Sequence, residues 1–517
     1  MIPDPTARPA VGFGVFWKQC FLIKRPLMKL KNLLEDVKFE LLQGSTEVEI
    51  SSLVYDSRKA SDGCAFVCIS GTQTDAHKYI PDVVEKGAAA VVVTRNVTAP
   101  ENVAVIKVND DREALALMSA AWFGHPAKKL TTIGITGTKG KTTTSYMIRN
   151  VLEKVGTKCG LIGTIETIIG DEHIPSSHST PESYTIQEYF AKMVEKGMTH
   201  VVMEVSSQGL KMKRVGGIIF DYGIFTNLEP DHIGGNEHPD FNDYLYCKSL
   251  LFRSCRIGLG NIDDKHFDEI MKNRTCELFS FGTGEGADYR ASDIELTKAG
   301  IKYKATTKDN REYEVVVDIP GRFTVYNSLT ALALCDLLGV DHEATLKGLS
   351  DVKVRGRVET VPVSEDFTIM VDYAHNEMSL RSVLTTLREY KPARLVCVFG
   401  CGGNRSKDRR YSMGRVSGEL ADLTVITSDN PRFEKPEDII ADIVSSIEKV
   451  PGADYVVVQD RFEAIKYCID NARPGDLILV AGKGHEDYQE IEGVKHHMDD
   501  VELILRADSE KKARENR

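Results

Sequence analysis

The stretch ITGTKGKTTTSY, from Ile135 to Tyr146, decides the fold because it reads as a phosphate-binding loop in a shortened form. A Walker A loop has a glycine, four other residues and then Gly-Lys-Ser/Thr. Here the residue five places before Gly140 is Ile135, and the first glycine is Gly137. The apolar run TTIGIT precedes the loop, and TTTSYMIRNVLEKVG follows it with apolar residues at helical spacing. A strand, a glycine loop and a helix in this order predict an anion site at the helix N-terminus.

The loop carries two side chains that suit a nucleoside triphosphate. Lys141 can reach terminal phosphate oxygens, and the hydroxyl of Thr142 can ligate Mg²⁺. The alternative is a glycine-rich turn that contains Gly-Lys-Thr by chance, but the flanking strand and helix favour a nucleotide site. We therefore predict that the protein uses ATP or GTP.

Length and composition bound the class of protein. A chain of 517 residues is too long for one core, and three domains are the natural expectation. The 65 basic against 76 acidic residues give a net charge of −11, which argues against a general nucleic-acid binder. No apolar run approaches the roughly 20 residues that span a bilayer, so we expect no membrane insertion. Eleven cysteines without C-x-x-C pairs favour reduced thiols and a cytoplasmic protein.

The order of apolar runs predicts an α/β protein in three domains. Residues 1–27 read as a poorly ordered extension, with Met28 as a plausible alternative start, and 28–109 as a small α/β domain. Residues 110–355 form the central domain, a parallel sheet with the glycine loop, and its part from about 285 to 320 reads as antiparallel strands. Strands alternate with helices again in 356–517, which predicts a second doubly wound, Rossmann-like sheet.

Several residues outside the loop are candidates for chemistry. Glu204 ends an apolar strand, where it either holds Mg²⁺ beside the loop or is a solvated strand-end carboxylate. Asp231, His232 and His238 lie in a turn-rich stretch and are surface residues or ligands. Lys248 lies among apolar neighbours, so it either extends to water or is chemically altered.

Three loops of the last domain should meet at one edge of its sheet, because each follows an apolar strand: CGGNRSKDRR, SDNPRFEKP and AGKGHEDYQ. They contribute Arg405, Arg409, Arg410, Arg432, Lys483, His485 and Glu486. Such a group suits a ligand with carboxylates and phosphates. The residues alone thus predict an ATP-dependent enzyme with an anionic, amino-acid-like second substrate, and they leave the reaction open.

From about Met28 to its end, the sequence resembles the Mur ligase family, whose ATP loop has the shortened form of TGTKGKTTT. The resemblance is strongest to members that add the third residue of the peptidoglycan stem. It implies that ATP contacts Gly137, Thr138, Lys139, Gly140, Lys141, Thr142, Thr143, Asn327, Arg357 and Asp372. Lys141, Lys248, His232 and His375 are implied as catalytic. Two Mg²⁺ ions are implied, with Thr142, Glu204, His232 and a carbamylated Lys248 as ligands.

The resemblance also implies the substrates, a UDP-MurNAc-dipeptide and a diamino acid. The nucleotide sugar and dipeptide are expected at Tyr55, Ser57, Thr72, Gln73, Thr74, Ser179, Thr180, Ser207 and Arg214. The incoming amino acid is expected at Arg410, Asp429, Asn430, Pro431, Arg432, Gly482 and Glu486. The form DNPR resembles members that add meso-diaminopimelate, because an arginine binds the distal carboxylate bidentately.

The implied reaction transfers the γ-phosphate of ATP to the D-glutamate carboxylate of UDP-MurNAc-L-Ala-D-Glu, and the incoming amine attacks the acyl phosphate. The sequence departs from the family's usual pattern at Thr324, after His375, and in the longer stretch DHIGGNEHPDF, which leaves L-lysine open as the third residue. A folylpolyglutamate synthetase is a rival that the DSR and DNPR motifs disfavour. A non-catalytic nucleotide-sensing protein is another. We expect a monomer.

Overall fold

The computed structural model describes residues 26–71, 74–231, 233–234, 237–297 and 300–515. The chain divides into two compact units, Met1–Trp122 and Phe123–Arg517. Both are α/β, so the predicted fold class is confirmed. Of the predicted extension 1–27, all but the last two residues lie outside the described residues. Within the described ranges, no helix combines the length and the apolar character needed to cross a membrane.

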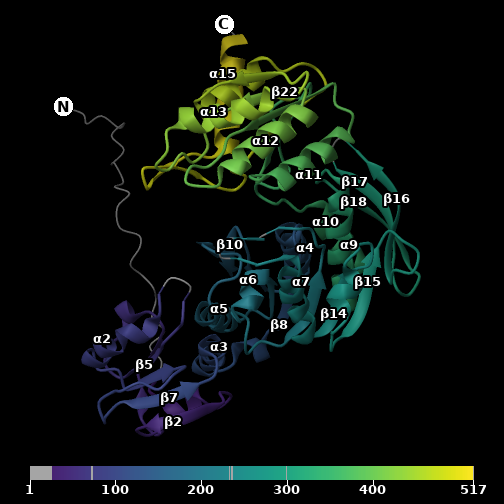
Figure 1. Ribbon diagram of the computed structural model, residues 1–517. Coiled ribbons are helices and arrows are strands. Elements are labelled where there is room, and N and C mark those ends of the chain that lie inside the picture. The colour runs from purple at the N-terminus through teal and green to yellow at the C-terminus, as the bar shows by residue number, and fades with distance from the viewer. Residues whose placement is uncertain (1–25, 72–73, 232, 235–236, 298–299, 516–517) are drawn as a thin grey trace, which may run out of the picture. The chain divides into compact units, whose positions relative to one another are not determined.

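The first unit is built on a five-stranded sheet, drawn in purple and blue in Figure 1. Its order is β2 (Phe39–Gln43), β7 (Ala104–Val108), β6 (Ala90–Val93), β5 (Cys64–Val67) and β4 (Ser52–Val54). All neighbours are parallel except β2 and β7. The unit also contains the short pair β1 (Met28–Lys29) and β3 (Glu49–Ile50), and the helices α1 (Leu30–Leu33), α2 (Ile80–Glu85) and α3 (Asp111–Trp122).

Helix α3 belongs to this first unit, whereas the sequence predicted a new domain from residue 110. Its buried residues, among them Leu115 and Met118, pack with α1, β4 and β5. The apolar spacing of this segment predicted the helix but not the sheet on which it packs. The other predicted boundary, between 355 and 356, stays a prediction.

The central region contains an eleven-stranded sheet, of which Figure 1 shows β14 to β18 side by side in teal. The order is β11 (Glu172–Pro175), β10 (Glu166–Ile169), β9 (Cys159–Ile162), β12 (His200–Glu204), β8 (Thr131–Thr136), β13 (Phe220–Phe225), β14 (Cys255–Asn261), β15 (Glu277–Gly282), β16 (Tyr289–Leu296), β17 (Ile301–Thr306) and β18 (Glu312–Val317). The strands from β9 to β16 in this order are parallel. Strands β16 to β18 are antiparallel, which confirms the prediction for the segment from about 285 to 320.

Helices cover both faces of this sheet because its central strands are buried on both sides. One hydrophobic core lies under α4 (Lys141–Lys154), α9 (Arg322–Leu337) and α10 (His342–Ser350). The core on the other face lies under α5 (Ser183–Glu195), α6 (Ser207–Lys211), α7 (Phe241–Ser249) and α8 (Phe267–Met271). Because β8 lies between β12 and β13 in the sheet, the glycine loop that follows β8 has a neighbouring strand on each side.

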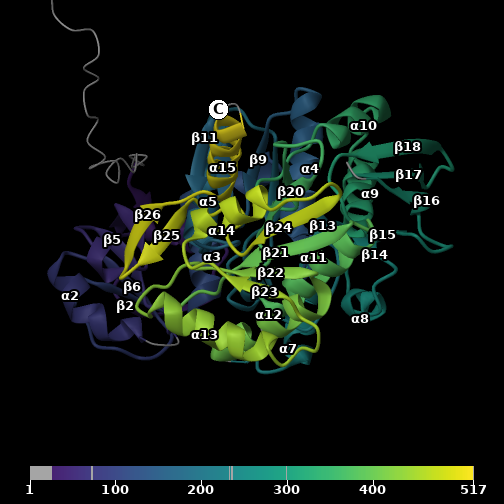
Figure 2. The same cartoon turned by 90° about the horizontal axis from the view of Figure 1, so that it is seen from above.

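The last region is drawn in green and yellow in Figure 2. It has a six-stranded sheet with a hydrophobic core of its own on each face. The order is β19 (Glu359–Val361), β20 (Thr368–Asp372), β24 (Asp476–Ala481), β21 (Arg394–Phe399), β22 (Leu423–Ile426) and β23 (Tyr455–Val457), parallel except for β19. One face carries α11 (Glu377–Arg388), α12 (Lys407–Leu420) and α13 (Pro436–Ile447). The other carries α14 (Arg461–Asp470) and α15 (Asp500–Glu515), and the hairpin β25 (Tyr488–Ile491) and β26 (Val494–His497) precedes α15. This is the predicted doubly wound sheet.

Candidate functional site

The glycine loop has a backbone that only glycine adopts easily at its two ends. Gly137 has φ 147° and Gly140 has φ 84°. A side chain at Gly137 would collide with the hydroxyl of Thr226, and a Cβ at Gly140 would lie 2.5 Å from Oδ1 of Asn327. Among the described residues, no side chain caps the first turn of α4. The amides of that turn are therefore free to bind an anion.

The end of strand β13 supports the loop from the side. The hydroxyl of Thr226 donates to the carbonyl of Lys139 at 2.7 Å. The amide of Lys139 donates to Oδ1 of Asn227 at 2.9 Å, and Nδ2 of Asn227 donates back to the carbonyl of Lys139 at 3.0 Å. Sequence reasoning missed both supporting residues. The available signal was their position directly after an apolar strand, which predicts the edge of the sheet but not the loop that they contact.

Two lysines converge on one carbonyl of this loop. Nζ of Lys141 donates to the carbonyl oxygens of Gly137 at 2.7 Å and Thr138 at 3.0 Å. Nζ of Lys248 also donates to the carbonyl of Gly137 at 2.7 Å, over the ring of Tyr244. Lys248 is 1% exposed and does not extend to water. Burial lowers the pKa of Lys141, and burial with the Lys141 charge nearby lowers the pKa of Lys248 far below its ordinary value.

Glu204 is a buried carboxylate rather than a solvated one. It lies at the end of β12 with no exposed surface. The amide and the hydroxyl of Thr164 donate to its two oxygens at 2.9 and 2.8 Å. Within the described ranges, no lysine or arginine lies at ion-pair distance from it. A buried, oriented carboxylate that has no ion-pair partner among the described residues suits a metal ion, since Mg²⁺ prefers oxygen ligands.

Asn327 presents a donor beside the loop. It is buried in α9, and its Oδ1 accepts from the hydroxyl of Thr144 at 3.3 Å. Its Nδ2 is buried and has no partner among the described residues. Such a group costs free energy unless a ligand satisfies it. This arrangement fits the expected nucleotide contact, as does the buried position of Thr142 in the first turn of α4.

The residues expected to hold the dipeptide gather around the end of β12. The hydroxyl of Ser179 lies 2.7 Å from that of Thr164, and Thr180 donates to the backbone carbonyl of Glu204 at 2.9 Å. Nη1 of Arg214 donates to the carbonyl of Thr180 at 2.9 Å. Ser207 begins α6. These four residues therefore share one neighbourhood in the central region.

The loop after β13 holds the histidines that sequence reasoning left open. His232 lies outside the described residues, so the structure says nothing of its predicted metal and catalytic roles. His238 is 1% exposed, which rules out the interpretation as a surface residue. Its ring lies at hydrogen-bond distance from Ser207 and Asp243.

The first unit carries the expected nucleotide-sugar residues on a short turn and a loop. Ser57 begins a 3₁₀ turn, and the carboxylate of Asp56 accepts from Arg58. Thr74 is exposed, and its carbonyl accepts from the amide of Gly71 at 3.0 Å. Tyr55 precedes the turn, whereas Thr72 and Gln73 lie outside the described residues.

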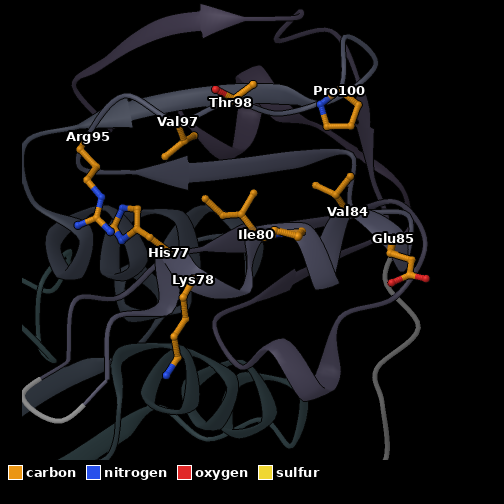
Figure 3. A pocket seen from close by; sticks show the side chains of 10 residues that line it. His77, Lys78, Ile80, Val84, Glu85, Arg95, Val97, Thr98 and Pro100 are labelled. Atoms are coloured by element: carbon orange, nitrogen blue, oxygen red, sulfur yellow. The ribbon is translucent and has the colours of Figure 1, made fainter.

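A pocket in the same unit is lined by other residues, shown in Figure 3. They are His77, Lys78, Ile80, Pro81, Val84, Glu85, Arg95, Val97, Thr98 and Pro100. Two of its polar groups are already used within the unit, because His77 and Arg95 both contact the carboxylate of Asp75, at 2.6 Å. Of the expected nucleotide-sugar residues that the structure describes, Tyr55, Ser57 and Thr74, none lines it.

The acceptor loops of the last region form a connected polar group. Nδ2 of Asn430 donates to Glu486 at 2.9 Å, and the buried Lys483 donates to Oδ1 of Asn430 at 3.1 Å. Gly482 has φ 114°, and a Cβ there would lie 2.8 Å from Oδ2 of Asp429. The loops after β22 and β24 therefore meet, as their positions after parallel strands predicted.

The two arginines expected near the acceptor differ in their partners. Arg410 is 1% exposed, and its guanidinium donates to Glu434 and Asp442 at 2.8 and 2.9 Å. Its charge is thus balanced inside the domain. Arg432 has φ 53° and donates from Nε to Glu490 at 3.1 Å and from Nη1 to the carbonyl of Gly403 at 2.8 Å. Nη2 of Arg432 makes no such bond with the described residues.

A buried ion pair connects both acceptor loops, and sequence reasoning missed it. Arg461 donates to both carboxylate oxygens of Asp500 at 2.7 Å, and both side chains have no exposed surface. Its guanidinium also donates to the carbonyl of Ala481 at 3.1 Å and of Ser428 at 3.4 Å. These carbonyls directly precede Gly482 and Asp429, so the pair holds the starts of both loops.

The residues expected to close over ATP surround Tyr373. The guanidinium of Arg357 lies 5.0 Å from its ring, and Nδ1 of His375 lies 2.8 Å from its carbonyl. Burial lowers the pKa of His375, so its ring is neutral at neutral pH. Asp372 accepts from the amides of Val358 and Ala374 at 2.9 Å, and burial raises its pKa.

Three segments of the chain match descriptions of one family. Residues 135–335 match "Mur ligase middle domain", residues 356–484 match "Mur ligase, glutamate ligase domain", and residues 49–123 match "Mur ligase family, catalytic domain". The middle-domain match contains the glycine loop, Glu204 and Lys248.

Curated relatives match along almost the whole chain. The chain is 41% identical, over 94% of its length and 100% of the relative, to the UDP-N-acetylmuramoyl-L-alanyl-D-glutamate--2,6-diaminopimelate ligase of Caldanaerobacter subterraneus subsp. tengcongensis. It is 43% identical, over 92% of its length and 98% of the relative, to such a ligase, numbered 1, of Clostridium acetobutylicum. A solved structure of a ligase with this name matches with a TM-score of 0.71 at 28% identity, covering 94% of this chain and 100% of that one.

A folylpolyglutamate synthase of Mycobacterium tuberculosis, solved with ADP and AMPPCP, shares the fold alone. Its TM-score is 0.57 at 14% identity, and the match covers 71% of this chain and 91% of that one.

Proposed function

Because the chain belongs to the Mur ligase family, we propose that it is the ATP-dependent ligase that joins meso-diaminopimelate to UDP-MurNAc-L-Ala-D-Glu. The names of its relatives support this substrate pair, since they match over more than nine tenths of the chain. The observation that carries the proposal is the glycine loop, whose Lys141 lies within electrostatic reach of the buried carboxylate of Glu204.

The loop and its neighbours suit transfer of a phosphoryl group to a carboxylate. The amides of the first turn of α4 and the ammonium group of Lys141 would bind the phosphates, and Nδ2 of Asn327 would donate to the nucleotide. Thr142 and Glu204 would hold Mg²⁺, which neutralises phosphate charge during transfer. The number of two ions stays a prediction.

Lys248 fits the proposed carbamate. A neutral amine is the form that attacks carbon dioxide, and burial keeps the pKa of Lys248 far below its ordinary value. The amine nitrogen would bond to the carbon of CO₂ and lose a proton, which converts the side chain into an oxygen ligand. The second Mg²⁺ ligand set would then include this carboxylate.

Arg432 is the residue that we assign to the distal carboxylate of meso-diaminopimelate. Nη2 makes no hydrogen bond with the described residues, and a guanidinium binds a carboxylate through two parallel bonds. L-Lysine lacks this carboxylate. Asn430 and Glu486 beside it would bind the amino-acid end of the substrate.

Phosphate release by the purified protein tests the function. We expect release with ATP, UDP-MurNAc-L-Ala-D-Glu and meso-diaminopimelate together, and much slower release when L-lysine replaces the diamino acid. Equal rates with L-lysine would overturn the choice of third residue and leave the ligase class intact. Release only with a folyl substrate and glutamate would support the folylpolyglutamate synthetase instead, and nucleotide binding without turnover would support a sensing protein.

Variants of the acceptor loop sharpen the same assay. Arg432→Ala should lower kcat/KM for meso-diaminopimelate by about 10- to 100-fold, the value of a charge-assisted hydrogen bond, and leave the KM for ATP unchanged. Arg415→Ala, which removes an exposed guanidinium of α12, is the matched control. A monomeric state and a cytoplasmic location stay predictions.

A further inference from the structure

Ser207, His238 and Asp243 form a buried hydrogen-bonded relay in the central region. Oγ of Ser207 lies 2.9 Å from Nε2 of His238, and Nδ1 of His238 lies 2.6 Å from Oδ2 of Asp243. The side chain of His238 has no exposed surface. Nζ of Lys211 donates to the same carboxylate oxygen at 2.7 Å. Neither the family's ATP chemistry nor its acceptor site, as described above, uses His238.

The direction of each hydrogen bond follows from the chemistry of the groups. The ammonium of Lys211 and the His238 ring hold the pKa of Asp243 below its ordinary value, although burial alone would raise it. An ionised carboxylate only accepts, so Nδ1 of His238 carries the proton. In the neutral ring Nε2 is then an acceptor, and the hydroxyl hydrogen of Ser207 points to it. Within the part of the chain that the structure describes, no group donates to the Ser207 hydroxyl, so its lone pairs are left to accept a bond from a ligand.

A metal ion does not suit this cluster, although Cys247 lies close enough to be a third ligand. The ammonium of Lys211 already contacts the carboxylate oxygen that would bind the ion. Burial raises the pKa of the Cys247 thiol to about 11, so it remains a protonated thiol rather than a thiolate. The same order of residues serves nucleophilic catalysis in hydrolases, but an acyl-phosphate ligation has no step for a nucleophilic serine.

We propose that His238 and Asp243 are positioning residues that fix Ser207 as a hydrogen-bond acceptor for an amide N–H of the muramoyl-dipeptide. This inference rests on the proposed function, because Ser207 is one of the residues assigned to that substrate. Ser207 lies next to the other residues of that set: the hydroxyls of Ser206 and Thr180 lie 3.1 Å apart, and the carbonyl of Thr180 accepts from Arg214. If the Ser207 hydroxyl is a hydrogen-bond acceptor, it favours a peptide N–H of the substrate and disfavours a carboxylate in the same position.

Asp243→Leu tests the relay because it removes the oxygen that holds the ring proton on Nδ1, the same oxygen to which Lys211 donates. With the proton on Nε2 instead, the ring donates to Ser207, and the Ser207 hydroxyl donates toward the substrate. We expect KM for UDP-MurNAc-L-Ala-D-Glu to rise by about 3- to 10-fold, the value of one lost neutral hydrogen bond, while KM for ATP and for the diamino acid stays unchanged. Binding of the dipeptide without ATP, followed by calorimetry, should weaken equally.

Two further variants separate polarity from loss of structure. Lys211→Met removes the ion pair with Asp243 but preserves the direction of the relay, and should change the KM for the dipeptide by less than about twofold. Ser207→Ala should raise this KM, and adding Asp243→Leu to it should have no further effect.

Equal dipeptide affinity in wild type and Asp243→Leu, or the same loss in Lys211→Met, would overturn the relay. Additive losses in the double variant would overturn it as well. None of these results bears on the proposed function, whose failure would show as no phosphate release in the wild type.

Discussion

Lys141 and Lys248 donate hydrogen bonds to the same backbone oxygen, the carbonyl of Gly137, each at 2.7 Å. Two ammonium groups at this distance from one atom repel each other, and one of them is buried away from water. Burial and this repulsion both favour the neutral form of Lys248 and lower its pKa far below the ordinary value.

Lys248→Met should stabilise the fold and abolish activity. Burial and the Lys141 charge lower the pKa of folded Lys248 far below its ordinary value of 10.5, so the folded state releases this proton at a lower pH than the unfolded chain. The unfolded state therefore binds more protons, and the free energy of unfolding of the wild type rises with pH toward that value. In bicarbonate-free buffer we expect Lys248→Met to raise this free energy at neutral pH by about 1 to 3 kcal/mol and to flatten its pH dependence. Urea unfolding across neutral and alkaline pH measures both. A less stable variant with the wild-type pH slope would contradict this account.

Thr164→Val should weaken metal binding more than it weakens the fold. The substitution removes the hydroxyl that donates to Glu204 at 2.8 Å and keeps the amide that donates at 2.9 Å. We expect the apparent affinity for Mg²⁺ to fall by about 10- to 100-fold, as for other groups that orient a metal ligand. Thr164→Ser retains a hydroxyl and should behave like the wild type. Mg²⁺ titrations of phosphate release at saturating substrates measure the difference, and unchanged affinity in Thr164→Val would show that Glu204 needs no such orientation.

Gly140→Ala should impair ATP binding, whereas Gly156→Ala should cost stability alone. The two glycines bound α4 with similar φ angles, 84° and 80°. Both substitutions carry the strain of a left-handed alanine, about 1 to 2 kcal/mol. At Gly140 the new Cβ also meets Asn327, while nothing lies within 4 Å of one at Gly156. Calorimetric titration with ATP should therefore separate the variants, and equal ATP affinity would mean that the loop relaxes without loss.

Arg461→Met should destabilise the last region because it leaves Asp500 buried without its partner. Breaking such a pair costs about 3 to 5 kcal/mol. Arg381→Met removes an exposed pair with Glu419 and should cost less than about 1 kcal/mol. Urea unfolding measures both. A loss in Arg461→Met no larger than in Arg381→Met would show that water reaches the buried carboxylate.

The sequence was most informative where neighbouring residues determine structure. The run from Thr131 to Lys154 predicted a strand, a loop and a helix, because apolar period and glycine positions are local features. The same holds for the strands β20 to β24, whose apolar runs predicted the second doubly wound sheet.

The supporting residues could not be predicted because their contacts join distant parts of the chain. Asn227 reaches the loop only because β13 lies next to β8, and Thr164 reaches Glu204 because β9 lies next to β12. Arg410 was expected to meet the substrate, but its partners Glu434 and Asp442 are fixed by the packing of α12 on α13. Its role in the acceptor site stays a prediction.

Arg461 donates to the carbonyls of Ser428 and Ala481 and so holds the first residues of both acceptor loops in place. The starting points of these loops are fixed by an ion pair that has no exposed surface, so the residues beyond can vary without moving the sheet. Substitutions at a few loop positions can therefore change which amino acid the enzyme selects during evolution, while the residues of the glycine-loop site stay the same.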